Sequence, residues 1–269
     1  MGTAIELNQL KSTKDRFTLS GKKAIVTGAA GGIGRSCAAA IAELGADVAL
    51  IDLKGDVAQQ NAEYIADKFG VKALAYGVDI SDVTAVNDMM GNIIKEFGRV
   101  DCVHSNAGIF DGDDNTDMPI ELWRKMVDIN LTGMYIVNKA ACIHMRDTKN
   151  GGAIVNTASM SGSIVNRVPG RHNIGYPATK AGVKHLTKAL AMDFRNDNIR
   201  VNSVSPGYMF SGIHDGLPQD LLDTVAADVP MNRFGTMDEI GGAVAFLMTD
   251  LASYITGADI IIDGGYTVW

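Results

Sequence analysis

Cysteine is scarce in this sequence. Its 269 residues include three cysteines, Cys37, Cys102 and Cys142, and their spacing fits neither a CxxC motif nor a zinc-ligand set. An odd number of such scattered thiols argues against a disulfide framework and indicates free, buried cysteines in a reducing compartment. We therefore expect no metal site and a location in the cytoplasm.

Basic clusters and long apolar runs are missing as well. The chain has 24 Lys and Arg residues against 31 Asp and Glu, and no run of basic residues offsets the formal net charge of −7. This pattern argues against nucleic-acid binding. No apolar run reaches membrane-spanning length, and residues 1–20 carry five charged side chains, so we expect neither a signal peptide nor a membrane anchor. We interpret residues 1–20 as an N-terminal arm that covers a neighbouring surface.

Glycine, by contrast, is abundant. It accounts for 30 of 269 residues, about eleven per cent, against roughly seven per cent in ordinary proteins. With 46% hydrophobic and 20% charged residues, the chain has the composition of a large globular domain, which excludes disorder. We expect its partner to be a small molecule or another subunit.

Apolar, β-rich runs alternate with segments of helical periodicity along the whole chain. Parallel strands need crossover helices and are buried on both faces, so this alternation predicts one α/β domain over residues 21–269. We expect a Rossmann-type, doubly wound parallel sheet of about seven strands with helices on both faces. The predicted strands are 23–27, 47–51, 72–78, 100–104, 153–157, 199–204 and 259–262, and the predicted helices are 34–44, 56–69, 82–97, 119–146, 176–195 and 237–248.

A glycine-rich turn, Thr27–Gly34, follows the first predicted strand directly and leads into a helix. Without side chains, its backbone N–H groups can approach a pyrophosphate at the positive end of that helix. A simple tight turn is the alternative, but the place of the turn in the first strand-to-helix connection favours a dinucleotide site. The predicted contacts are Gly28, Gly31, Gly32, Ile33 and Gly34.

Asp52 ends the second predicted strand, 18 residues beyond Gly34. A carboxylate at this point can accept hydrogen bonds from both adenosine-ribose hydroxyls, and it repels a 2′-phosphate. The sequence therefore favours NAD over NADP. Lys54 could pair with such a phosphate, but a solvated loop lysine is the simpler interpretation.

Tyr176 and Lys180 stand four residues apart at the start of a helical pattern, which places them on one face of the helix. A lysine ammonium beside a tyrosine favours the phenolate and lowers the tyrosine pKa. Such a tyrosine can exchange a proton with an alcohol or carbonyl oxygen. The pair follows the fifth predicted strand, near the sheet edge where such folds bind ligands.

These motifs occur together in one order, and together they resemble the short-chain dehydrogenase/reductase family. The resemblance covers residues 20–269 and rests on Thr27–Gly34 (TGxxxGxG), Asn106-Ala107-Gly108, Asn130 in DINLTG, Ser159, Tyr176 with Lys180, and Pro206-Gly207.

The resemblance implies a role for each residue of a catalytic set. Tyr176 would be the acid/base, and Lys180 would lower its pKa and bind the nicotinamide ribose. Ser159 would hydrogen-bond the reacting oxygen, and Asn130 would hold a water that links Lys180 to solvent. Implied cofactor contacts besides Asp52 and the glycine turn are Leu53, Asp79, Ile80, Asn106, Ala107, Gly108, Tyr176, Lys180, Pro206, Gly207, Met209 and Ser211. The family also implies a homotetramer.

Two serines compete for the catalytic position. Family members usually have this serine about thirteen residues before the tyrosine, where Ser163 stands, whereas Ser159 precedes Tyr176 by 17 residues. We choose Ser159 because it directly follows the strand AIVNT, and the extra length fits into the loop that follows. Ser161 and Ser163 remain structural or substrate-contacting alternatives.

The segment 164–175 and the ending DGGYTVW resemble the polyol and sugar-alcohol dehydrogenases of the family, which predicts a polyol, sugar or sugar-acid substrate. Residues 209–229, with a short helix, are predicted to form a substrate loop that closes as a lid. A hydroxysteroid or a 3-oxoacyl thioester is the alternative substrate, and a nucleotide-binding regulatory protein is the non-enzymatic alternative. Candidate substrate contacts are Ser161, Asn166, Arg167, His172, Tyr208 and His214.

Several other polar residues have ordinary interpretations. The acidic stretch of Asp111, Asp113, Asp114 and Asp117 lacks the register of a calcium loop, so we interpret it as a solvated loop at the rim of the site. His104 is assigned to packing or to the surface.

Overall fold

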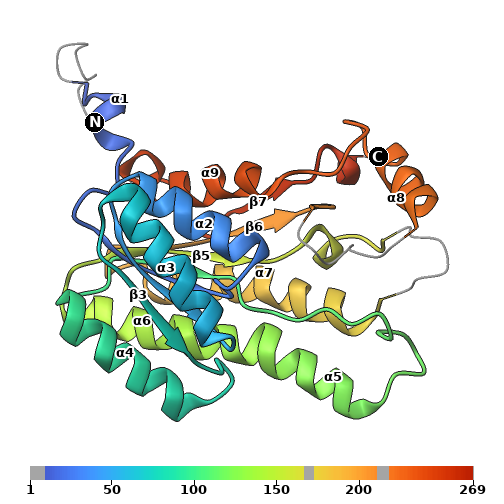
Figure 1. Ribbon diagram of the computed structural model, residues 1–269, viewed down its shortest axis with the longest axis horizontal. Helices are drawn as coiled ribbons and strands as arrows, with labels where there is room; N and C mark the ends of the chain where they lie inside the picture. Colours follow the sequence, from blue (N-terminus) through green and yellow to red (C-terminus); the bar gives the residue numbers. More distant parts are fainter. Residues whose placement is uncertain (1–9, 167–172, 211–217, 269) are drawn as a thin grey trace.

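The computed structural model describes residues 10–166, 173–210 and 218–268. Seven parallel strands form one sheet in the order β3-β2-β1-β4-β5-β6-β7 (Figure 1). The predicted doubly wound α/β domain is confirmed, and each predicted strand is present to within about two residues. The strands are β1 (Lys23–Thr27), β2 (Asp47–Asp52), β3 (Ala73–Gly77), β4 (Cys102–Ser105), β5 (Gly152–Thr157), β6 (Ile199–Pro206) and β7 (Asp259–Ile262).

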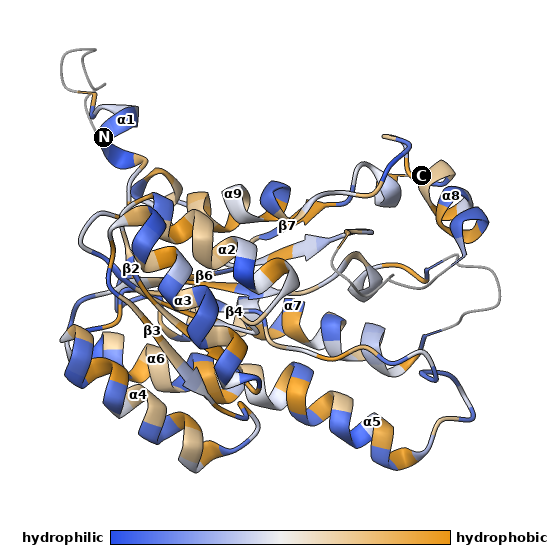
Figure 2. Ribbon diagram, viewed as in Figure 1, coloured by the Kyte–Doolittle hydropathy of each residue, from blue (hydrophilic) through white to orange (hydrophobic). Residues whose placement is uncertain are grey.

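Helices cover both faces of this sheet. Alternate strand residues point to opposite faces, so Val26 of β1 packs with the first group of helices and its neighbour Ile25 packs with the second. The first group is α2 (Gly32–Glu43), α3 (Gly55–Phe69) and α9 (Met237–Met248), and the second is α4 (Val83–Phe97), α6 (Met134–Asp147) and α7 (Gly175–Asp193). In Figure 2 these helices carry both hydrophobic and hydrophilic residues, as expected for helices with one buried face.

The single helix predicted over 119–146 is three segments. An α-helix, α5 (Ile120–Val127), passes into a π-helical turn, η2 (Asp128–Gly133), before α6 continues. Hydrophobic periodicity does not reveal a π turn, because the turn shifts the register of an amphipathic helix only locally. The turn matters because it carries Asn130.

The N-terminal segment packs on its own chain in the part that the structure describes. The short helix α1 (Thr13–Arg16) places the Arg16 guanidinium 2.6 Å from the backbone oxygen of Asp250, and Leu19 is buried with its N–H on the oxygen of Leu44. Residues 10–20 thus contact their own domain, and a role of the arm in covering a neighbouring surface remains a prediction. Their contacts place Leu19 in the core of the domain.

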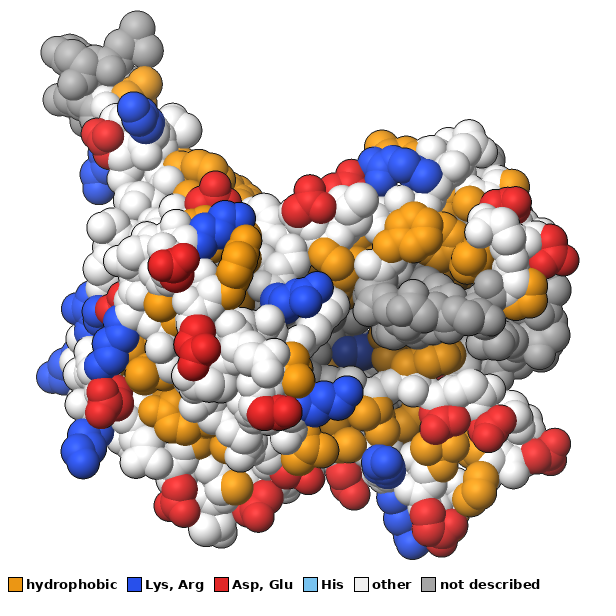
Figure 3. All heavy atoms as spheres, in the orientation of Figure 1, with side chains coloured by type: hydrophobic (Ala, Val, Ile, Leu, Met, Phe, Trp, Pro, Cys, Tyr) orange, Lys and Arg blue, Asp and Glu red, His pale blue; other side chains and the backbone are white. Residues whose placement is uncertain are grey.

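The described residues show four further features relevant to function. Acidic and basic side chains are interspersed on the face drawn in Figure 3, so neither sign dominates it. No described helix has both the length and the apolar character needed to cross a membrane. The three cysteines are free and buried, as predicted, and the described part of the chain contains no cluster of three or more potential metal ligands.

Candidate active site

The strand order reverses direction between β1 and β4. Open α/β sheets bind ligands at such a switch point, along the edge formed by the carboxyl ends of the strands. Thr27 ends β1 at this edge, and its hydroxyl accepts hydrogen bonds from the N–H groups of Asn106 (2.9 Å) and Ala107 (3.0 Å). The Asn106 amide donates back to the Thr27 backbone oxygen at 3.2 Å. These bonds join the turn after β1 to the turn after β4 across the switch point.

The glycine-rich turn combines tight packing with open space. Gly28 has φ +69°, and a Cβ there would lie 2.8 Å from the Asn106 amide nitrogen and 2.9 Å from the Cα of Ala107. Gly31, at the N-terminal end of α2, has no protein atom within 4 Å of such a Cβ. The turn therefore presents an accessible helix N-terminus, which suits a phosphate group.

Asp52 sits beside this turn at the end of β2. Its carboxylate accepts hydrogen bonds from the N–H groups of Ala30 and Lys54, both at 3.0 Å. Asn61 of α3 holds the same turn from the other side, because its amide donates to the backbone oxygens of Ala29 (2.9 Å) and Ala30 (3.0 Å). Sequence reasoning missed Asn61, since an asparagine within a helix gives no signal of a contact to a distant turn.

Tyr176, Lys180 and Ser159 come together where β5 meets α7. The Lys180 Nζ lies 5.5 Å from the centre of the Tyr176 ring and donates to the backbone oxygen of Thr157 at 2.8 Å. Ser159 lies close enough to Tyr176 to oppose a rise in the tyrosine pKa. The structure thus brings three of the four predicted catalytic side chains into direct contact or close approach.

Burial is the main cause of the pKa shifts of Lys180 and Tyr176. Lys180 is 3% exposed, and burial lowers its pKa to about 8. Burial raises the pKa of Tyr176 above its usual value, and the hydrogen bond from Ser159 opposes this rise. The sequence-based expectation of a lowered tyrosine pKa is therefore not met in the protein alone, because removal of the phenolate from water outweighs the favourable hydrogen bond.

Near Lys180 lies a buried pair, His104 and Thr157, of which the sequence analysis assigned His104 to packing or to the surface. His104 of β4 is buried, and its Nε2 lies 2.9 Å from the Thr157 hydroxyl. Burial lowers the pKa of His104 to about 3, and the nearby Lys180 charge adds to this effect. The imidazole is therefore neutral, and the Thr157 hydroxyl donates onward to the Asn106 side-chain oxygen at 3.1 Å.

Asn130 is fully buried in the π turn. Its side-chain oxygen accepts from the Ile109 N–H at 2.7 Å, and its amide donates to the Ile109 oxygen at 2.9 Å. A Cβ on Gly108 would lie 3.1 Å from the same Asn130 oxygen and 3.6 Å from the Lys180 Nζ. Asn130 thus lies near Lys180, with its side chain engaged by the backbone after β4.

The two candidate serines point to different neighbours. Ser159 is 7% exposed and contacts Tyr176, and its hydroxyl also donates to Ser161 at 3.2 Å. Ser163 is exposed and accepts a hydrogen bond from Lys184. This geometry favours Ser159. Ser161 donates to Asn166 at 3.0 Å, so two predicted substrate contacts form one hydrogen-bonded pair next to Ser159.

The turn after β6 packs against the C-terminal segment. A Cβ on Gly207 would lie 2.7 Å from the Asp263 Cα, so this glycine is needed for a close crossing of two backbones. Tyr208 packs edge-on against Tyr266, with ring centres 5.2 Å apart, in a cluster that includes Phe234. These contacts give Gly207 and Tyr208 packing roles that the sequence did not predict.

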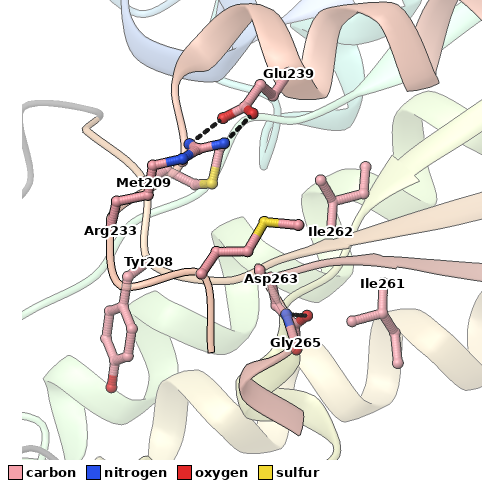
Figure 4. A pocket seen from close by; sticks show the side chains of 11 residues that line it. Tyr208, Met209, Arg233, Glu239, Ile261, Ile262, Asp263 and Gly265 are labelled. Carbon is pink, nitrogen blue, oxygen red and sulfur yellow. Dashed lines mark hydrogen bonds and ion pairs between the residues drawn. The ribbon is translucent and has the colours of Figure 1, made fainter. Parts of the chain in front are cut away.

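A pocket of about 510 Å³ opens beside this turn (Figure 4). Met209 lies in its wall, and the Arg233 guanidinium pairs with both Glu239 carboxylate oxygens at 2.7 and 2.8 Å. In Figure 4 the Tyr208 ring points away from this ion pair. Neither Tyr176 nor any other predicted catalytic residue lines the pocket, so it is distinct from the reacting groups.

Other predicted contact residues differ in their exposure to solvent. Leu53 is 75% exposed next to Asp52, and Ile80 is buried beside Gly133. Asp79 is exposed, and hydrogen bonds from Ser81 lower its carboxyl pKa. Outside the described residues lie Arg167, His172, Ser211 and His214.

One acidic residue contradicts its predicted environment. Asp114, expected in a solvated loop, is 1% exposed and accepts three backbone hydrogen bonds from the start of α7. Its neighbour Asp113 is exposed, as expected. Composition places both in an acidic loop, and only the tertiary fold distinguishes them.

Comparisons with known proteins agree with this geometry. A sequence profile described as enoyl-(acyl carrier protein) reductase matches residues 28–267. An NADP-dependent mannitol dehydrogenase of Alternaria alternata is 39% identical over 267 residues, which cover 98% of this chain and 99% of that protein. A sorbose reductase of Candida albicans is 38% identical, with 94% of this chain and 89% of that protein covered.

Solved structures show the same likeness over the whole fold. The crystal structure of a short-chain type dehydrogenase/reductase from Mycobacterium marinum matches with a TM-score of 0.91 and 41% identity. The match covers 95% of this chain and 99% of that chain. The similarity therefore extends through the sheet, its helices and the segments that carry the site.

Proposed function

The chain belongs to the short-chain dehydrogenase/reductase family and is an oxidoreductase of alcohol groups, and we propose that it uses NAD(H) to interconvert a secondary alcohol and a ketone. The observation that carries this proposal is the contact group at the end of β5. Ser159 opposes the rise in the Tyr176 pKa, and the Nζ of the buried Lys180 lies 5.5 Å from the centre of the Tyr176 ring.

The residues present fit a nicotinamide dinucleotide. The open backbone at Gly31 and the N-terminus of α2 suit the pyrophosphate, and the Asp52 carboxylate suits the adenosine ribose. Asn106 and Ala107 are hydrogen-bonded to Thr27 at the end of β1, and Gly108 follows them close to Lys180. When bound, the nicotinamide ring supplies or accepts the hydride that the reaction requires.

Proton transfer falls to the protein. Tyr176 takes the hydroxyl proton when an alcohol is oxidised and returns it when a ketone is reduced. Ser159 donates its hydroxyl hydrogen to the reacting oxygen, which stabilises the negative charge that develops there. Lys180, with a pKa of about 8, changes charge near neutral pH and stabilises the Tyr176 phenolate when it is protonated.

A polyol, sugar or sugar acid is the substrate class that we propose. One line of support is the names of two relatives, a mannitol dehydrogenase and a sorbose reductase. The other is the hydrogen-bonded polar pair Ser161 and Asn166, which lies beside Ser159. A site with hydrogen-bonding groups selects hydroxylated substrates and rejects analogues that lack them. The predicted contacts His172 and His214 and the lid over 209–229 belong to the same proposal.

NAD as the cofactor rests on Asp52. The mannitol dehydrogenase relative is described as NADP-dependent. In this chain the Asp52 carboxylate stands at the end of β2, where it would face a 2′-phosphate. We therefore propose that this chain prefers NAD. A homotetramer remains a prediction from the family, and a cytoplasmic location remains a prediction from the cysteine content.

The experiment that tests the function is NADH formation from NAD across a panel of polyols, simple secondary alcohols and hydroxysteroids at alkaline pH. We expect turnover on polyols. Tight NADH binding without turnover on any alcohol would favour the nucleotide-binding regulatory alternative, and turnover confined to hydroxysteroids would replace the substrate class.

A further inference from the structure

The helix that carries Tyr176 and Lys180 begins without a cap of its own. Ile174 occupies the N-cap position of α7, and an aliphatic side chain accepts no hydrogen bond. Pro177 has no N–H group, and the Ala178 N–H bonds to the Ile174 oxygen. Three N–H groups therefore need an acceptor from elsewhere in the fold, those of Ile174, Gly175 and Tyr176.

Asp114 supplies that acceptor from 60 residues upstream. One carboxylate oxygen accepts from Ile174 at 3.1 Å and from Gly175 at 2.6 Å, and the other accepts from Tyr176 at 2.8 Å. The side chain is 1% exposed. A buried carboxylate is costly unless hydrogen bonds and opposite charge compensate it, and the positive end of the 19-residue helix α7 provides both.

The rest of this segment also contacts the site. Ile109 makes a reciprocal pair of hydrogen bonds with Asn130, at 2.7 and 2.9 Å. The Phe110 ring meets the Tyr176 ring edge-on, with centres 5.5 Å apart. Residues 109–114 therefore contact Asn130, the Tyr176 ring and the Tyr176 backbone as the chain passes from β4 toward α5 (Figure 1).

We propose that Asp114 is a positioning residue for Tyr176. Its carboxylate ties the loop after β4 to the first turn of α7 and so fixes the Tyr176 backbone, while Phe110 of the same loop contacts the Tyr176 ring. The inference builds on the proposed function, because it concerns the residue that transfers the proton there. Asp114 does not touch the reacting atoms. It acts on them through the helix, and a displacement of about 1 Å at a catalytic group can cost about a hundredfold in rate.

The test compares Asp114→Ala and Asp114→Asn with the matched control Asp113→Ala, which removes an exposed carboxylate from the adjacent position. Hydrogen exchange measured by mass spectrometry reports the Ile174, Gly175 and Tyr176 amides without any need for activity. We expect exchange there to accelerate at least about tenfold in Asp114→Ala, with an intermediate change in Asp114→Asn, whose single carbonyl oxygen still accepts. Asp113→Ala should behave like the wild type.

Kinetics provide the second readout. We expect kcat to fall about tenfold to a hundredfold in Asp114→Ala, with the Kd for NADH changed less than about twofold, because the glycine turn and Asp52 are untouched. If Asp114→Ala fails to fold, Asp114→Asn carries both measurements. Unchanged exchange at these amides overturns the proposal, as does an unchanged kcat despite faster exchange. A wild type that turns over no alcohol refutes the proposed function instead, and the exchange result then still decides whether Asp114 holds the first turn.

Discussion

The Lys180 Nζ donates to the backbone oxygen of Thr157 at 2.8 Å, deep enough in the protein that burial lowers its pKa to about 8. Thr157 in turn contacts the buried, neutral His104 through its hydroxyl. Burial of the charged lysine at the end of β5 therefore destabilises the folded protein. A group held in this way is typical of an active site, where function requires an unfavourable burial.

This cost gives a prediction for the free energy of unfolding. Between its folded pKa of about 8 and its usual value of 10.5, the unfolded chain binds more protons at Lys180 than the folded chain does, so stability through this group rises with pH there. Below that window the penalty is about 3 kcal/mol, offset by about 1 kcal/mol for the bond to Thr157. Lys180→Met should therefore be inactive and, near neutral pH, about 2 kcal/mol more stable than the wild type.

Denaturant unfolding across this pH range measures the effect. The stability advantage of Lys180→Met should shrink as pH rises from neutrality toward 10.5. A Lys180→Met protein that is less stable than the wild type at neutral pH, or whose advantage does not depend on pH, would show that the lysine is not penalised by burial.

Asp52 determines the cofactor preference in this account. Asp52→Ser should raise kcat/KM for NADP by about tenfold or more, because it removes a negative charge that repels the 2′-phosphate. The substitution should also lower kcat/KM for NAD, because NAD loses the hydrogen bonds from its ribose to Asp52. The ratio of the two kcat/KM values is the measurement, and an unchanged ratio would mean that another residue sets the preference.

Asn61 should affect cofactor binding without touching the reaction. Asn61→Leu removes two hydrogen bonds to the glycine turn, each worth about 1 kcal/mol, so the Kd for NADH should rise by about tenfold or more. Gln59→Ala on the same helix is the control, since its side chain bonds only to the exposed Glu63 among the described contacts. Equal effects of the two substitutions on the Kd would contradict a specific role for Asn61.

The two serines are separated by paired substitutions. Ser159→Ala should lower kcat by about a hundredfold to a thousandfold, as loss of a donor to a developing oxyanion does in other enzymes. Ser163→Ala should stay near wild-type activity, because this side chain is exposed beside Lys184. The reverse pattern would move the catalytic role to Ser163 despite the geometry.

Much of this site follows from local sequence pattern. The glycine turn, Asp52, Tyr176 and Lys180 are close in sequence to strand ends, and parallel strands bring those ends to one edge of the sheet. Asp114 and Asn61 do not follow from it. Their partners lie about 60 and 30 residues away, and neither spacing nor composition records which acidic or amide side chain turns inward.

The direction of the Tyr176 pKa shift also could not be predicted from the sequence. The sequence proximity of Tyr176 and Lys180 predicts a lowered tyrosine pKa. In the structure Lys180 is buried and Tyr176 is partly buried, and burial favours the neutral form of each. The sequence predicts Gly207 as a cofactor contact and Tyr208 as a substrate contact. The structure shows that their packing against Asp263 and Tyr266 also constrains them.

The central claim is that Tyr176 transfers the proton in an alcohol dehydrogenase reaction, and Tyr176→Phe tests it most directly. The substitution removes one hydroxyl and keeps the ring that packs against Phe110. On the best substrate of the panel, we expect kcat to fall by at least about a hundredfold, while the Kd for NADH, followed by fluorescence, stays within about twofold of the wild type. A Tyr176→Phe enzyme with wild-type kcat would contradict the account.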